Sequence, residues 1–143
     1  MRTDSTMVKE RLDLRNSPLN ASFAVKDIDT ARDFYKGTLG LDVRDDTEMG
    51  IFEIHGPGDT TVFVYPKPDH EPAVFTVLNV TVRDLDATVD SLNAAGVPIE
   101  HYDGKDGPKT DARGIAGKAG EPRMAWFRDP DGNILAVMQV PGR

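Results

Sequence analysis

The sequence predicts an α+β protein built from two successive βαβββ modules. The main evidence is an internal repeat, in which Val-Lys-Asp-Ile-Asp-Thr-Ala at residues 25–31 resembles Val-Arg-Asp-Leu-Asp-Ala-Thr at residues 82–88. Each copy follows an apolar or alternating run and precedes apolar residues at helical spacing. Three strand-like runs then follow in each half, so one repeated unit accounts for nearly the whole chain.

In the first module, a strand at residues 21–25 leads into a helix. Asp27 stands at the expected N-cap, and Gly40 follows the last apolar position of the helix. The apolar helical positions share one face; they are Ala31, Phe34, Tyr35 and Leu39. Strands are predicted at about residues 41–44, 50–55 and 60–65, with a Gly-Pro-Gly-Asp turn before the last.

The second module repeats this order. A strand at residues 77–82 leads to a helix that begins after Asp84 and ends at Gly96. Its apolar face consists of Leu85, Val89, Leu92 and Ala95. Strands are predicted at about residues 97–102, 123–128 and 133–140, with a tight Asp-Pro-Asp-Gly turn before the last.

The repeat also sets the domain organisation. Residues 1–18 are a polar N-terminal arm, and residues 19–143 form a single domain with modules at about 19–66 and 75–140. Prolines at 66, 68 and 72 mark a linker between them, because proline lacks the N–H that a central strand needs. The glycine-rich segment 103–122 is either a lid or a solvated insertion.

Composition excludes several functional classes. The formal net charge of −7 offers no basic surface for nucleic acid. No run approaches the length of a membrane span, and the N-terminus lacks the apolar core of a secretory signal. There is no cysteine, which rules out disulfides, a thiolate nucleophile and cysteine-based metal sites. We therefore expect a cytoplasmic protein.

The sequence of the repeat resembles that of the vicinal oxygen chelate superfamily, which includes glyoxalase I, extradiol dioxygenases, fosfomycin-resistance proteins and bleomycin-binding proteins. The resemblance rests on Val25-Lys26-Asp27, Phe34-Tyr35, Leu39-Gly40-Leu41 and the run from Phe127 to Asn133, and it extends from about residue 19 to 140. It implies that the two modules form a cupped mixed sheet, the glyoxalase/bleomycin resistance fold.

The resemblance also implies four metal-ligand positions, which hold His or Glu in the metalloenzymes. Here they align with Asn20, Phe63, Val77 and Ala136. The strands that carry them contain no His, Asp or Glu, so a shift of one residue recovers no ligand. We therefore expect no metal at this site and no cofactor.

What remains is a cup with an apolar lining, which suits a small hydrophobic or aromatic molecule. Strand alternation predicts the ligand-binding residues: Asn20, Ser22, Phe63, Tyr65, Val77, Asn79, Trp126, Ala136 and Met138. The predicted function is metal-independent small-molecule binding by a homodimer, with no nucleic-acid or membrane partner. Unpaired strand edges motivate the dimer.

Two alternatives stay open. One is a lyase, isomerase or epimerase that uses metal-free acid–base chemistry. Its candidate groups are Glu53, Tyr65, His101 and Asp103, and an off-site metal held by His55 with Glu53, His70 or His101 is a variant of this alternative. The other is a regulatory or interaction module whose cup is filled by side chains.

Overall fold

The computed structural model describes residues 12–142, which form two four-stranded mixed sheets, one per module. In the first sheet, β1 (Ala21–Val25) runs parallel to β4 (Thr61–Pro66), followed by the antiparallel strands β3 (Ile51–His55) and β2 (Asp42–Asp46). The second sheet repeats the order with β5 (Thr76–Thr81), β8 (Ile134–Gln139), β7 (Arg123–Arg128) and β6 (Ile115–Ala116). The tandem βαβββ prediction is confirmed. A single turn of 3-10 helix, η1 (Leu14–Asn16), precedes β1.

The helices begin and end where the sequence predicts. Helix α1 (Ile28–Arg32) continues as a π-helical segment, η2 (Asp33–Thr38), and α2 spans Leu85–Ala94. The Asp27 carboxylate accepts from the N–H groups of Asp29 and Thr30, each at 3.1 Å. The Asp84 carboxylate accepts from the Ala87 N–H at 3.0 Å, which satisfies an N–H group that the helix itself leaves unpaired.

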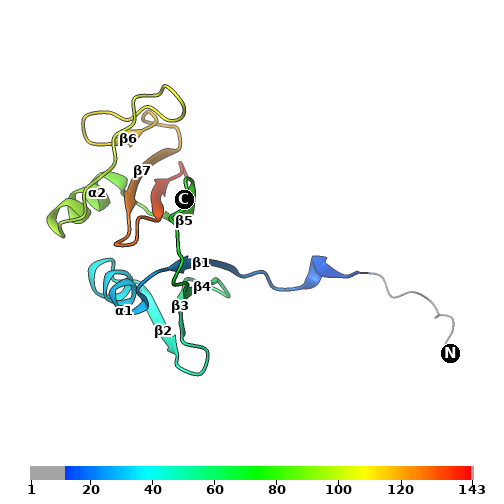
Figure 1. Cartoon of the computed structure of the whole chain (residues 1–143). Helices are drawn as coiled ribbons and strands as arrows, with labels where there is room; N and C mark the ends of the chain where they lie inside the picture. The colour runs from blue at the N-terminus through cyan, green and yellow to red at the C-terminus, as the bar shows by residue number, and fades with distance from the viewer. Residues whose placement is uncertain (1–11, 143) are drawn as a thin grey trace.

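The helices of both modules lie on the same side of the sheets, at the left in Figure 1. One continuous core fills the space between helices and sheets. It includes Tyr35 and Phe52 from the first module and Leu85 and Phe127 from the second, all essentially inaccessible. The other face of each sheet carries no helix within residues 12–142 and is called the open face below.

A buried polar cluster joins the modules. The Tyr35 hydroxyl donates to the Asp129 carboxylate at 2.7 Å, across 94 positions of the chain. Asp129 also accepts from the backbone and side-chain nitrogens of Asn133, and the Asn133 amide donates to the Ala24 carbonyl at 2.9 Å. The tight turn before β8 is therefore fastened to both the helix and the first strand of the other module.

One strand prediction is wrong. The predicted strand at 97–102 is reduced to a bridge between Ile99 and Phe127, and the edge strand of the second sheet is β6, inside the segment predicted as a loop. Pro98 cannot donate to a ladder, and Gly96 adopts a φ of 80° that ends α2 rather than starting a strand. β7 therefore receives its edge partners from two separate segments.

We predict that Tyr35→Phe destabilises the fold by about 1.5–3 kcal/mol, the usual loss for a hydrogen bond to a charged group. Burial and the neighbouring Asp129 raise the pKa of Tyr35 above its usual value. Above about pH 10, the Tyr35 phenol therefore ionises only in the unfolded chain. The free energy of unfolding of the wild type then falls by up to about 1.4 kcal/mol for each further pH unit. Urea denaturation at pH 8 and pH 11 checks both effects. If the free energies of unfolding of wild type and Tyr35→Phe differ by the same amount at both pH values, the buried, neutral Tyr35 hydroxyl is contradicted.

Candidate functional site

An apolar hollow on the open side lies over Trp126 and is called the tryptophan groove. Its volume is about 630 Å³. Trp126 in β7 forms its floor, and Tyr102 packs edge-on against Trp126 with the ring centroids 5.6 Å apart. The Trp126 indole N–H donates to the Thr76 hydroxyl at 3.2 Å, which fixes the plane of the ring. The groove therefore presents a rigid aromatic surface.

Two loop segments form the walls of the tryptophan groove. The linker contributes residues 72–75, including Val74, which is 93% exposed, and Phe75, which is 66% exposed. The other wall is the tip of the glycine-rich segment, with Asp103 and Asp106 at its rim. Burial raises the pKa of Tyr102, with a smaller contribution from nearby Glu100. This phenol is consequently a neutral hydrogen-bonding group at physiological pH.

A second hollow, called the linker groove, lies where the modules meet. It has a volume of about 570 Å³ and is more polar. Ser22, His70 and Asn133 line it, and the Nε2 atom of His70 is buried without a hydrogen-bond partner among the described residues. An unpaired buried imidazole nitrogen favours a bound molecule or water at this point.

The predicted ligand-binding residues do not converge on one cavity in a single chain. Trp126 lines the tryptophan groove, Ser22 and Val77 line the linker groove, and Asn20 lies in a shallow third groove at the start of β1 and β4. The remaining five line none of these three hollows: Phe63, Tyr65, Asn79, Ala136 and Met138. The helices cover the same side of both sheets, so the two open faces lie together on the other side of the chain.

A β-bulge explains the position of Val77. The register of β5 against β8 shifts between Thr76 and Leu78, so alternation from Val77 does not hold along the whole strand. Val77 packs against the core, while the Thr76 side chain contacts Trp126. The sequence analysis did not identify Thr76 as a site residue, because the pattern of polar and apolar residues along β5 does not reveal where a bulge shifts the register.

The residues at the family's ligand positions do not fit a metal ion. Phe63 sits in β4 between Ser22 of β1 and Glu53 of β3, and Ala136 pairs with Asn79 and Trp126. Phenyl and methyl groups have no donor atom, and one amide does not make a site. Among residues 12–142, no three His, Asp or Glu side chains converge as a metal site would require.

The predicted acid–base residues are dispersed. Glu53 and His55 form a pair on the open face of the first sheet, with Oε1 and Nε2 2.8 Å apart. His101 contacts the Ala112 carbonyl at 3.1 Å, and Asp103 accepts from the Lys105 N–H at 2.9 Å. Tyr65 is 38% exposed. Only Glu53 and His55 form a pair suited to proton transfer.

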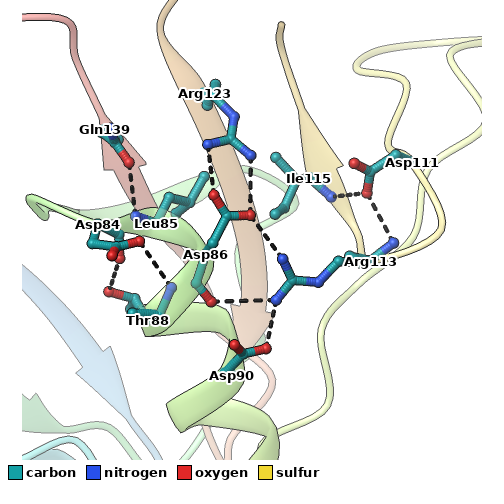
Figure 2. A network of polar contacts seen from close by, with 11 residues as sticks. Asp84, Leu85, Asp86, Thr88, Asp90, Asp111, Arg113, Ile115, Arg123 and Gln139 are labelled. Atoms are coloured by element: carbon teal, nitrogen blue, oxygen red, sulfur yellow. Dashed lines mark hydrogen bonds and ion pairs between the residues drawn. The ribbon is translucent and has the colours of Figure 1, made fainter. Parts of the chain in front are cut away.

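The glycine-rich segment is anchored rather than free along its length. Arg113 pairs with Asp86 of α2 at 2.7 Å and also with Asp90, and Arg123 shares Asp86 at 3.0 Å (Figure 2). Asp86 and Arg113 consequently tie the segment to α2, while β6 ties it to β7. An isolated backbone β-bridge joins Asp103 to Lys109. The Thr110 hydroxyl accepts from the Tyr102 N–H and donates to the Tyr102 carbonyl, which also accepts from the Thr110 N–H. Residues 106–108, at the tip of the segment, line the tryptophan groove.

Comparisons with known proteins agree with this architecture. Residues 19–137 match the model of the Glyoxalase/Bleomycin resistance protein/Dioxygenase superfamily. No protein of curated function matches the chain. No helix among residues 12–142 has the length and apolar character needed to cross a membrane.

Similar solved structures include TnmS3, an antibiotic-binding protein from Streptomyces sp. CB03234, at 28% identity and a TM-score of 0.61, covering 87% of this chain and 98% of that one. A lactoylglutathione lyase from Agrobacterium tumefaciens matches at 16% identity and a TM-score of 0.62, over 87% and 93% of the two chains. A glyoxalase/dioxygenase from Nostoc punctiforme matches at 20% identity and a TM-score of 0.63, over 94% and 99%.

We predict that Arg113→Ala loosens the glycine-rich segment without unfolding the protein. Removing the guanidinium leaves Asp86 and Asp90 without their link to the segment, so amide hydrogen exchange at residues 103–114 should accelerate severalfold. Arg44→Ala, which removes a comparable surface pair with Asp42, is the matched control. Equal rates of amide hydrogen exchange at residues 103–114 in the two variants would show that the ion pairs of Arg113 do not hold the segment.

Proposed function

Because this chain belongs to the glyoxalase/bleomycin resistance protein/dioxygenase superfamily, we propose that it is a metal-independent binding protein for a small planar hydrophobic molecule. The observation that carries the proposal is the tryptophan groove, in which a fixed indole forms the floor and Tyr102 and Phe75 flank it. We place this activity in the cytoplasm, where a chain without cysteine is well suited.

The dimensions and chemistry of the groove support this ligand class. Aromatic rings stack or meet edge-on with a planar ligand, and most of the lining is apolar. Its polar groups are the carboxylates of the rim, the Arg128 guanidinium and the hydroxyls of Thr76 and Tyr102. Burying about 200 Å² of apolar ligand surface contributes roughly 5 kcal/mol before the costs of binding. TnmS3, an antibiotic-binding protein, supports small-molecule binding as a function of this fold.

We further propose that a second copy of the chain completes the site. The open face of the first sheet carries Phe63 and Tyr65, and that of the second carries Trp126, Ala136 and Met138. In one chain these faces lie side by side, so neither covers the other. A two-fold dimer that places the first sheet of one copy over the second sheet of the other would bring all five residues into one cup.

We predict that planar hydrophobic compounds quench the fluorescence of Trp126, the only tryptophan, and raise the melting temperature. Tyr102→Ala should weaken binding about tenfold, because it removes an aromatic wall of the groove. Met49→Ala, at an exposed turn, is the control and should bind normally. Binding should survive a chelator. A broad compound library that gives neither quenching nor a thermal shift would contradict the proposal.

We predict a homodimer whose formation depends on the open face of the first sheet. Phe63→Asp places a carboxylate in the middle of that face and should convert the protein to monomers of 15.7 kDa in sedimentation equilibrium. The variant should also lose the ligand-induced thermal shift. Met49→Asp adds the same charge at an exposed turn and should stay dimeric. A wild-type monomer at micromolar concentration would overturn the prediction.

The Glu53–His55 pair favours one second candidate, a metal-free lyase, isomerase or epimerase. In the proposed dimer this pair sits on the cup face, one strand from Phe63, where a general base could reach a bound ligand. Chemical change of a bound compound that stops in Glu53→Gln, with binding unchanged, would identify an enzyme. Unaltered recovery of every bound compound identifies a binding protein.

A further inference from the structure

The linker groove contains a buried polar atom that the rest of the described chain leaves unpaired. His70 lies in the turn that follows β4, where its backbone N–H donates to the Lys67 carbonyl at 2.9 Å. His70 lines the linker groove, and its Nε2 atom is buried with no hydrogen-bond partner among residues 12–142. Such a nitrogen accepts a hydrogen bond when Nδ1 carries the proton, so a bound donor group or an ordered water is expected beside it.

The other uncharged polar groups of the linker groove are better acceptors than donors. Asn133 lines the groove, and its side-chain amide donates to the Ala24 carbonyl and to the Asp129 carboxylate, each at 2.9 Å. Both amide hydrogens are thereby used, so the Oδ1 acceptor is the group that Asn133 can still offer. Ser22 and Thr76 add hydroxyls, which accept as well as donate. This set of groups suits a ligand that brings several N–H donors.

The charged residues of the linker groove leave one negative charge without a partner. The charged residues that line it are Lys67, Asp69 and Glu71. The Lys67 ammonium pairs with Asp69. Glu71 lies within electrostatic reach of Lys67 but forms no ion pair of its own among residues 12–142. Two carboxylates against one ammonium favour a cation as the ligand.

The rest of the lining is hydrocarbon, and its largest exposed part is the ring of Phe75. Ala73, Phe75 and Thr76 line both the linker groove and the tryptophan groove, so this stretch is a wall that the two hollows share. Phe75 is 66% exposed. A short alkyl chain would cover part of this ring, and an ammonium group is attracted to a phenyl face. The volume of about 570 Å³ has room for a molecule of this kind.

We propose that the linker groove is a second binding site, which takes a small aliphatic primary amine in its ammonium form. The ammonium group donates to Nε2 of His70 and to Oδ1 of Asn133 and pairs with Glu71, while the alkyl chain lies on Phe75. The site goes beyond the function proposed above, because it requires neither a ligand over Trp126 nor a second copy of the chain.

Three small probes separate hydrogen bonding from charge. n-Butylammonium and tetramethylammonium are isomers with the same charge, but only n-butylammonium has N–H donors, and butyrate carries the opposite charge. The imidazole nitrogen signals of the three histidines are followed by NMR as each probe is added. We expect n-butylammonium to shift the Nε2 signal of His70 with a dissociation constant on the order of 1 mM, as for a fragment of this size. Tetramethylammonium should bind several times more weakly, and butyrate should not bind.

Three results of this titration would overturn the proposal. If the two cations bind equally well, the groove responds to charge alone and does not recognise an amine. If butyrate binds as tightly as n-butylammonium, the groove does not select for donors or for positive charge. If no probe gives a saturable shift at His70, an ordered water satisfies the Nε2 atom and the groove is not a site for this class of molecule.

Two variants test the assigned contacts, with binding followed through the NMR line widths of n-butylammonium. Glu71→Gln keeps the size of the side chain and should weaken binding up to about fivefold, the scale of one exposed ion pair. Glu48→Gln, in the exposed turn before β3, is its matched control. His70→Phe keeps a planar ring without nitrogen and should abolish binding, whereas His101→Phe should not. Circular dichroism verifies that each variant is folded. Unchanged binding in Glu71→Gln or in His70→Phe contradicts the contact assigned to that residue.

Discussion

The buried carboxylate of Asp129 is the contact on which the arrangement of the two modules depends. It is 5% exposed and accepts from Tyr35 of the first module and from Asn133 and Asp131 of the turn before β8. A carboxylate without these donors would be costly at this depth. The two modules are therefore held at one angle, with both helices on one side. That arrangement leaves both open faces without a covering helix, and it leaves Phe63 half-buried and Tyr65 exposed on the face where we propose that a second copy binds.

The repeat made most of the fold predictable. A helix start with Asp27 or Asp84 at the N-cap is a local signal, because the carboxylate satisfies backbone N–H groups two or three residues away. The glycines that end the helices are equally local, since Gly40 and Gly96 adopt a positive φ. These signals need no knowledge of distant contacts. The strands that pair in register were predictable from the alternation of polar and apolar residues, which is also a local signal.

The predictions failed where distant contacts decide the outcome. Residues 97–102 alternate as a strand would, yet Pro98 prevents a full ladder and β6 takes the edge of β7 instead. Arg113, two residues before β6, and Arg123, the first residue of β7, both pair with Asp86 of α2, which is distant from them in the sequence. Nothing local marks Arg113 as different from the other exposed arginines. The anchoring of the glycine-rich segment therefore had to come from the structure.

For the candidate site, the sequence predicts an apolar lining, whereas the position of the groove depends on segments without periodicity. Phe63, Ala136 and Trp126 follow from alternation, and their lack of donor atoms argues against the family's metal site whatever the shape of the cup. The groove itself depends on Tyr102 and on linker residues such as Phe75, which come from segments without periodicity. Thr76 belongs to the site only because of the bulge in β5. Where the metalloenzymes of the fold would bind substrate through an ion, this chain offers a fixed indole and apolar walls. Selectivity at such a surface comes from shape, so the segments that shape its mouth are the ones that decide which ligand binds.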